Sequence, residues 1–184
     1  ALGKASGKGN VDSFVVNVRR LLKQNKIDEA IEECDKQEGS VGNVVREGLT
    51  TYKALAHDTT MNKEQKMVAL NKSIEEATTL EMPMLEKNMM ILSTLGTVAT
   101  LVALLGTVIG MIKAFSALGS GGGTPDSAAL SIGISEALIN TALGIGTSAV
   151  AIILYNYFTS KIDGLTFKID EIAMSIQQSF AEFH

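Results

Sequence analysis

Two long uncharged stretches dominate the pattern of apolar and polar positions along the chain. Residues 88–112 contain no charged side chain over 25 positions, and residues 137–160 contain none over 24. As a helix, each stretch would be roughly 36 Å long at about 1.5 Å per residue, which exceeds the ~30 Å hydrocarbon core of a bilayer. The pattern predicts transmembrane spans at about residues 89–115 and 133–157. The alternative, a pair of buried helices in a soluble bundle, is less favoured because long soluble helices normally have a charged outer face.

The rest of the chain also has helical periodicity, so we expect an all-α membrane protein. Apolar residues at the 3.6-residue spacing predict short helices within residues 1–62. One long helix is predicted over residues 63–118, kinked at Pro83 because proline lacks the backbone donor. A glycine-rich loop over residues 119–126 leads to a second long helix over residues 127–180, which crosses the membrane and continues as an amphipathic tail.

Charge predicts the orientation of these elements. Thirteen of the sixteen Lys and Arg residues lie between Lys4 and Lys87, whereas the loop at 119–126 contains none. The positive-inside bias therefore places this loop outside and the short helices and both helix extensions in the cytoplasm. The net charge of −4 offers no electrostatic footprint for nucleic acid. Cys34 is the only cysteine and is expected to be a packed thiol, and we expect no metal site and no cofactor.

Hydroxyl side chains follow one side of the first span. At about 100° per residue they lie within roughly an 80° sector, and they are Ser93, Thr97, Thr100 and Thr107. Such a stripe is a candidate pore lining. The alternative is that each hydroxyl bonds to its own helix backbone, which is common in membrane helices.

The second span contains the one ionisable residue near the membrane interior, Glu136. Glu136, Asn140 and Thr147 fall within about a 40° sector, with Thr141 and Ser148 on an adjoining face. An ionisable group inside a bilayer is costly, so it indicates a hydrated or proton-carrying path. Because Glu136 lies toward the outer end of the span, simple solvation at the interface is the alternative.

Small residues recur at spacings of three and four in both spans. Because lipid provides little hydrophobic drive between helices, close backbone approach has to hold them together. The residues predicted to pack against other helices are Gly96, Ala103, Gly106, Gly110 and Gly144.

Two longer motifs resemble a known family. Residues 104–115, Leu-Leu-Gly-Thr-Val-Ile-Gly-Met-Ile-Lys-Ala-Phe, are similar to the second membrane helix of MotA/TolQ/ExbB proton channel proteins. Residues 134–144, Ile-Ser-Glu-Ala-Leu-Ile-Asn-Thr-Ala-Leu-Gly, are similar to the third. The short cytoplasmic helices and modest length most resemble the ExbB branch.

The resemblance implies a function and a set of partners. It implies a proton channel or stator in a bacterial inner membrane. Five copies of the chain would form a homo-oligomer around ExbD-like helices, whose Asp carries the proton. The complex would energise outer-membrane transport through a TonB-like protein. Thr107 and Thr141 match the family's pore-facing threonines, and Glu136 matches its membrane glutamate.

The chain departs from the family pattern in two respects. Thr100 and Val150 stand where family members usually have proline, so kinks at those positions are not carried over. The family's first membrane helix has no counterpart after Ala1 and is expected upstream of it.

Other functions stay open as alternatives. They are a TolQ- or MotA-like stator and a membrane scaffold that conducts nothing. An enzyme is not expected, since His57 lies without a matching nucleophile or metal-ligand spacing.

Overall fold

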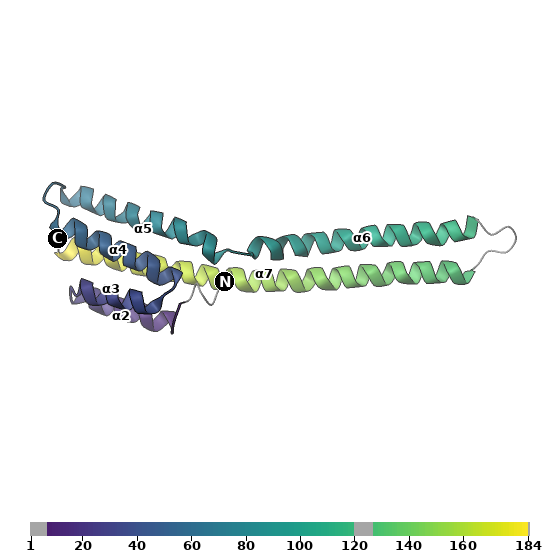
Figure 1. The fold of residues 1–184 in the computed structure, drawn as a ribbon, viewed down its shortest axis with the longest axis horizontal. Coiled ribbons are helices and arrows are strands. Elements are labelled where there is room, and N and C mark those ends of the chain that lie inside the picture. The colour runs from purple at the N-terminus through teal and green to yellow at the C-terminus, as the bar shows by residue number, and fades with distance from the viewer. Residues whose placement is uncertain (1–6, 120–126, 184) are drawn as a thin grey trace. The chain divides into compact units, whose positions relative to one another are not determined.

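A computed structural model describes residues 7–119 and 127–183, except for the side chains of residues 117 and 118. The described residues form helices and no strand, which confirms the all-α class. The helices are α2 (Val11–Lys23), α3 (Ile27–Gln37), α4 (Ser40–His57), α5 (Lys63–Leu85), α6 (Met89–Gly119) and α7 (Ser127–Phe183) (Figure 1). Apart from Gly119, the predicted loop over residues 119–126 lies outside the described residues.

The chain divides into two compact units. The first consists of residues 1–87 and 159–184, and the second consists of residues 88–158. The α7 helix contributes its first part to the second unit and its last part to the first unit.

The first unit is a small helical bundle with an apolar core. The α2 helix packs on α3, α3 on α4, and α4 on α5. The end of α7 completes the core: the Phe180 ring meets the Tyr52 ring edge-on, with 4.9 Å between their centroids. The largest fully buried side chains are Val18, Leu22, Val41, Val44, Leu49, Tyr52, Leu70, Leu85, Ile169, Ile172, Ile176 and Phe180. The short helices bury their apolar faces on one another and on α7, because each alone is too small to form a core.

Ion pairs surround this core at its surface. Those that join different helices are Asp12–Lys168, Arg19–Glu171, Asp28–Lys53 and Asp35–Arg46. Because solvent reaches these side chains, each contributes about 0–1 kcal/mol to stability. The apolar contacts therefore hold the bundle together, and the ion pairs favour the observed order of the helices.

The single helix predicted over residues 63–118 is wrong, because the structure contains two helices there. The α5 helix continues through Pro83 for two more residues and ends at Leu85, and α6 begins at Met89. Asn88 between them has φ of 73°, a left-handed conformation that an α-helix cannot include. Asparagine adopts this conformation more readily than most residues. The second long helix, predicted over residues 127–180, extends over Ser127–Phe183.

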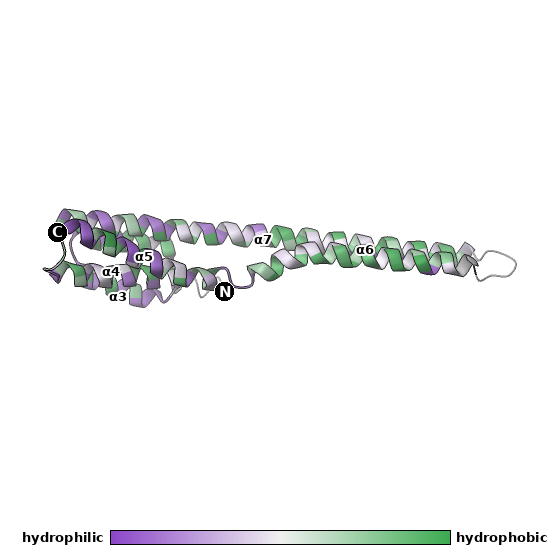
Figure 2. Cartoon of the chain, turned by 90° about the horizontal axis from the view of Figure 1, so that it is seen from above, coloured by the Kyte–Doolittle hydropathy of each residue, from purple (hydrophilic) through white to green (hydrophobic). Residues whose placement is uncertain are grey.

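The second unit consists of α6 and residues 127–158 of α7. Both helices are long and apolar enough to cross a membrane, with mean hydropathies of 2.2 and 1.9 in their most apolar windows. Figure 2 shows the hydrophobic colouring along both. Only 17% of the most apolar 18-residue stretch of α6 and 22% of that of α7 is buried. Most of this apolar surface therefore needs lipid or other helices to cover it.

The core of the first unit can be tested through its single thiol. Cys34 is 3% exposed, and burial raises its pKa from 9.0 to about 12, so in the folded unit at pH 8 it is inaccessible and neutral. Leu49 is fully buried, and Leu49→Ala should cost about 2–5 kcal/mol. We expect thiol-reactive labelling of Cys34 to become at least about 30-fold faster, because the open state becomes more populated. Val68→Ala, at a side chain 63% exposed, should leave the rate within about twofold. Equal rates in the two variants would contradict this description of the core.

Candidate functional site

The two helices of the second unit face each other through a seam of small residues. A Cβ atom added to Gly110 would lie 3.1 Å from the Cβ of Ala137, and one added to Gly133 would lie 2.7 Å from the Cβ of Ala114. A Cβ atom added to Gly144 would overlap the Cβ of Ala103. The two residue numbers of each facing pair add up to 247, as 110 and 137 do. The helices are therefore antiparallel and in one register along the seam.

The seam places the predicted packing glycines at contacts within the hairpin. Gly96 faces Ile152, whose Cγ1 would be 3.0 Å from an added Cβ, and Gly106 faces the side chain of Asn140 at 3.5 Å. Ala103 is buried. Close approach of two backbones favours dispersion contacts, the main attraction between helices in lipid.

A pair of threonines interrupts the glycine and alanine seam near its middle. The Oγ1 atoms of Thr107 and Thr141 are 2.5 Å apart, which is a hydrogen bond. Thr107 Oγ1 is also 3.0 Å from the carbonyl oxygen of Ala103, and Thr141 Oγ1 is 3.2 Å from that of Ala137. Both side chains are half-buried.

The two hydroxyls have two protons for three hydrogen-bond contacts. Either Thr107 donates to Ala103 and accepts from Thr141, or Thr141 donates to Ala137 and accepts from Thr107. The direction of the pair can therefore reverse by rotation of the two hydroxyls. A polar link that can reverse its direction is able to connect hydrogen-bonded groups on either side of it.

Asn140 contacts Gly106 across the seam, whereas the other predicted polar residues have, in the described part of the chain, hydrogen bonds within their own helix or none. Thr97 donates to the carbonyl of Ser93 at 3.5 Å, and Thr147 donates to that of Leu143 at 2.8 Å. Ser93, Thr97 and Thr147 are exposed, and Thr100 is half-buried. Glu136 and Asn140 are exposed as well.

The hairpin separates its polar residues onto two opposite faces. Gly106 contacts Asn140 while Thr107, the next residue, contacts Thr141, so these contacts lie on opposite flanks of the seam. Helical periodicity assigns the other polar residues to one flank or the other. The hydroxyl face contains Ser93, Thr97, Thr100 and Thr107, and the carboxylate face contains Glu136, Asn140 and Thr147. One chain therefore does not gather all the predicted pathway residues on one side.

Ser148, which the sequence places on the same face as Thr141 but which was not predicted to belong to the pathway, forms a second polar contact across the seam. Ser148 is 8% exposed, and its hydroxyl donates a hydrogen bond to the backbone carbonyl of Gly96. A signal for it exists in the sequence, because Ser148 follows Thr141 by seven residues and so returns to the same side of α7. Along the seam, this contact lies near the start of α6, whereas the contact of Gly133 with Ala114 lies near its end.

Two open hollows lie along the hairpin. The first, of about 610 Å³, is beside the hydroxyl face and is lined by Thr107, Val108, Met111, Ile112, Phe115 and Ser116. The second, of about 560 Å³, includes Thr147 of the carboxylate face and is otherwise lined by Leu92, Leu95, Ala142, Leu143, Gly146, Val150, Ala151 and Leu154. Both are mainly apolar, with two hydroxyl residues in the first and one in the second, which suits apolar helix side chains better than a charged solute.

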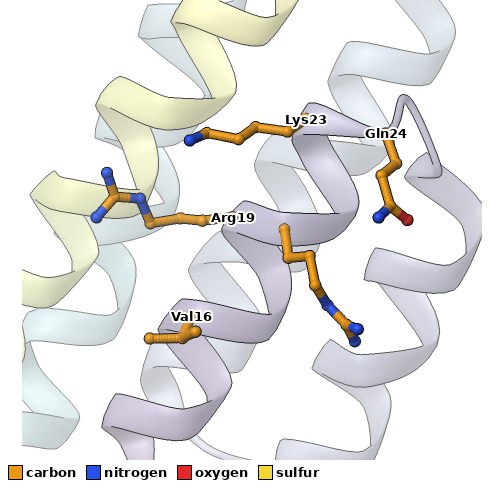
Figure 3. A pocket seen from close by; sticks show the side chains of 5 residues that line it. Val16, Arg19, Lys23 and Gln24 are labelled. Carbon is orange, nitrogen blue, oxygen red and sulfur yellow. The ribbon is translucent and has the colours of Figure 1, made fainter.

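The first unit has a separate, basic hollow on the outer surface of α2. It measures about 410 Å³ and is lined by Val16, Arg19, Arg20, Lys23 and Gln24. Figure 3 shows Arg19 and Lys23 extending toward the same side of α2, with Gln24 on the other. Arg19 already pairs with Glu171. Across residues 7–119 and 127–183, no group of three or more His, Cys, Asp or Glu side chains is placed to hold a metal ion.

Comparison with known proteins identifies relatives of this hairpin. The family model described as the MotA/TolQ/ExbB proton channel family matches residues 36–171, which include both α6 and the first part of α7. This range contains every residue of the hydroxyl and carboxylate faces.

Curated relatives give the same result. The chain is similar to a putative biopolymer transport protein ExbB-like 3 of Synechocystis, with 32% identity over 113 residues, covering 61% of this chain and 54% of the relative. It is similar to the biopolymer transport protein ExbB of Xanthomonas campestris, with 33% identity over 61% of this chain and 44% of the relative. The Tol-Pal system protein TolQ of Pseudomonas aeruginosa is 29% identical over 70% of this chain and 55% of its own length. The chain thus spans about half the length of these relatives.

The seam can be tested with two glycines of the same helix. Gly144→Ala places a methyl group against Ala103, so we expect the hairpin to lose about 1–3 kcal/mol. Nothing lies within 4 Å of a Cβ at Gly146, so Gly146→Ala should be neutral or slightly stabilising. Thermal unfolding of the protein in detergent should show a lower Tm for the first variant only. Unchanged stability of Gly144→Ala would mean that the helices are not in contact there.

Proposed function

Because the chain belongs to the MotA/TolQ/ExbB proton channel family, we propose that it is the channel or stator subunit of a proton-driven motor in a bacterial inner membrane. In this proposal it forms the pore with ExbD-like helices, and the motor energises outer-membrane transport through a TonB-like protein. Relatives named ExbB support this branch of the family. No cofactor is required, because the transmembrane potential and proton gradient supply the free energy.

The Thr107–Thr141 hydrogen bond is the observation that supports conduction best. It is a reversible hydroxyl link in a seam made mainly of glycine and alanine, and Thr107 also lines an open hollow. A seam that served packing alone would be filled as well by two small apolar residues, without hydroxyl protons to satisfy. We propose that the two hydroxyls, by exchanging donor and acceptor roles, link waters or partner groups on either side of the pair into one hydrogen-bonded chain.

Glu136 has a different role in this proposal. It is the only Asp or Glu in the two spans, residues 89–115 and 133–157, and a carboxylate can bind a proton and release it. The threonines, Asn140 and the other hydroxyls orient water, whereas a carboxylate on the partner helices carries the proton through the centre. Alternating protonation of a carboxylate changes its charge, and that change can move a partner helix in the membrane field.

The arrangement in the membrane follows from the same proposal. Transmembrane spans at about residues 89–115 and 133–157 are joined by a periplasmic loop at 119–126, with the first unit in the cytoplasm. Several copies, five in the family pattern, surround the partner helices. The exposed apolar surface of α6 and α7 would then be covered by lipid and neighbouring subunits.

Two other functions are consistent with particular observations. The 29% identical TolQ favours a stator of a Tol-Pal type system, which would use the same hairpin. A scaffold that conducts nothing is favoured by the bonds of Thr97 and Thr147 to their own helix, since such hydroxyls need no pore. A MotA-like stator would again share the family's spans.

Conduction can be tested at the threonine pair. In the variant Thr107→Val with Thr141→Val, shape is nearly retained and both hydroxyls are lost, so the complex should assemble while proton-driven uptake through the outer membrane falls at least tenfold. Native mass measurement of the purified complex checks assembly, and energised ligand uptake by cells checks function.

A matched control comes from the same helix. Thr94 is exposed and donates to the carbonyl of Met90 at 2.8 Å, away from the seam. Thr94→Val should therefore leave uptake within about twofold of wild type. Uptake at the wild-type rate in the double variant, with the complex intact, would refute conduction through this pair.

Glu136 separates the channel from the scaffold. Glu136→Gln retains size and hydrogen bonding and removes the exchangeable charge, so a channel should lose most of its proton flux into liposomes that contain the reconstituted complex. If the protein is a scaffold, Glu136→Gln should leave its function unchanged. Larger residues at Gly96, Ala103 or Gly106 should instead prevent assembly. Full flux in Glu136→Gln would therefore favour the scaffold.

A further inference from the structure

The hairpin contains very few charged side chains. In residues 88–158 they are Lys113, Asp126 and Glu136, and Asp126 lies outside the described residues. Lys113 and Glu136 are both exposed, and neither has an ion pair or hydrogen bond with another described residue. An isolated charge on a membrane-length apolar helix is costly when it faces lipid. Each of these two charges therefore needs a partner once the hairpin is in a bilayer.

Lys113 is also an exception to the distribution of basic residues. Every other Lys or Arg lies within residues 4–87 or 161–168, which belong to the first unit. Lys113 lies instead near the end of α6 that leads to the loop, on the side where the positive-inside bias disfavours a basic residue. A lysine at this position is most economically explained by a negative partner close to it.

The register of the seam brings Lys113 and Glu136 to one side of the hairpin. Gly106 contacts Asn140. Lys113 follows Gly106 by seven residues and Glu136 precedes Asn140 by four, and both steps return to nearly the same side of the helix. Lys113 therefore lies on the carboxylate face. Facing residues have numbers that add up to 247, so Lys113 lies at the depth of Ile134, about 3 Å along the axis from Glu136.

Two long side chains can close the remaining gap. Helix axes about 8–10 Å apart place the two Cα atoms about 8–10 Å from each other. Because each Cα–Cβ bond tilts toward the N-terminus of its helix and the helices are antiparallel, Lys113 leans toward the depth of Glu136 and Glu136 leans toward that of Lys113. Rotation of the side chains alone is enough to bring the ammonium to the carboxylate.

We propose that Lys113 is the positioning residue for Glu136, and that its ammonium pairs with the Glu136 carboxylate when lipid or other helices cover the carboxylate face. An exposed pair in water gains little, whereas the attraction grows where water is excluded. The pair keeps the carboxylate ionised and fixed in place, so a proton that binds Glu136 has to displace the ammonium. This inference rests on the proposed function, in which Glu136 binds and releases a proton.

No other charge in the described part of the hairpin competes with Lys113 for this role. From α6, Lys113 is the one charged group on the side of Glu136. On α7, the titratable side chains Tyr155 and Tyr157 lie nineteen or more residues from Glu136, or about 28 Å. Asp126 is the remaining acidic residue and is tested separately below.

A double-mutant cycle on the full-length complex in lipid nanodiscs tests the pairing. Lys113→Met and Glu136→Gln should each lower the Tm by at least about 2 °C, because each leaves the other charge unpaired. The variant with both changes should unfold no lower than the less stable single variant, since both charges are then gone. Lys113→Arg retains the cation and should retain the wild-type Tm.

The pH profile of proton flux tests the positioning role. A cation beside a carboxylate favours its charged form, so in reconstituted liposomes Lys113→Met should move the flux profile to higher pH by about one unit, a tenfold change in proton concentration. Lys113→Arg should leave the profile in place. The matched control is Lys87→Met, the same change at an exposed lysine just before α6, and it should alter neither the Tm nor the profile.

Several outcomes would overturn the inference. Additive Tm shifts would show that the charges do not pair, and pairing with an unmoved pH profile would refute the positioning role. Coupling of Lys113→Met to Asp126→Asn, in place of Glu136→Gln, would assign the lysine to the loop. If Lys113→Met does not assemble, the exchange of Lys113→Glu with Glu136→Lys should restore assembly, and failure to do so counts against the pair.

The two measurements also separate this inference from the proposed function. A wild-type complex that conducts protons, but has additive Tm shifts, refutes the inference alone. A wild-type complex without flux refutes the proposed function and the positioning role with it, and the stability cycle then still decides whether Lys113 and Glu136 pair.

Discussion

The close approach of α6 and α7 is the constraint on which the rest of the hairpin depends. Two helices in lipid gain little by hiding apolar surface from each other, so their attraction comes from dispersion at short range. Gly110, Gly133 and Gly144 permit that range because each faces an alanine on the other helix. A register fixed by so many small contacts leaves little freedom to slide, and a fixed register determines which polar groups meet.

The threonine pair is a consequence of this register. Thr107 and Thr141 meet because Ala103 faces Gly144 and Gly110 faces Ala137, and these contacts flank the pair on both sides. A slip by one residue would turn each side chain by about 100° and separate the hydroxyls. Packing thus supplies the positional accuracy that the hydrogen bond between the two hydroxyls requires.

The sequence was sufficient for the helical class, for the two apolar helices and for the family, because uncharged runs and the motifs around Thr107 and Glu136 are local features of the chain. The break at Asn88 was not predictable from periodicity, because a left-handed residue interrupts a helix without interrupting its apolar pattern. Pro83 predicted a kink inside one long helix, whereas α5 continues through Pro83 and ends at Leu85. The sequence also does not show whether the polar residues of α6 and those of α7 lie on the same side of the hairpin. The contacts of Gly106 with Asn140 and of Thr107 with Thr141 show that they lie on opposite sides.

Opposite placement of the two polar faces has a consequence for how such a protein can work. A carboxylate surrounded by its own chain's hydroxyls would be satisfied in the monomer, and its protonation would be insensitive to neighbours. Glu136 is exposed and has no such partner among residues 7–119 and 127–183, so its environment depends on whatever packs against the hairpin. A proton-binding group of this kind responds to the arrangement of adjacent subunits, because moving a partner changes the solvation of the carboxylate and hence the free energy of its charged form. The same coupling works in reverse by linkage: binding of a proton must favour one arrangement of the neighbours over another. In the function that we propose, coupling of proton occupancy to helix movement would therefore arise where other helices pack against Glu136 and not within one hairpin.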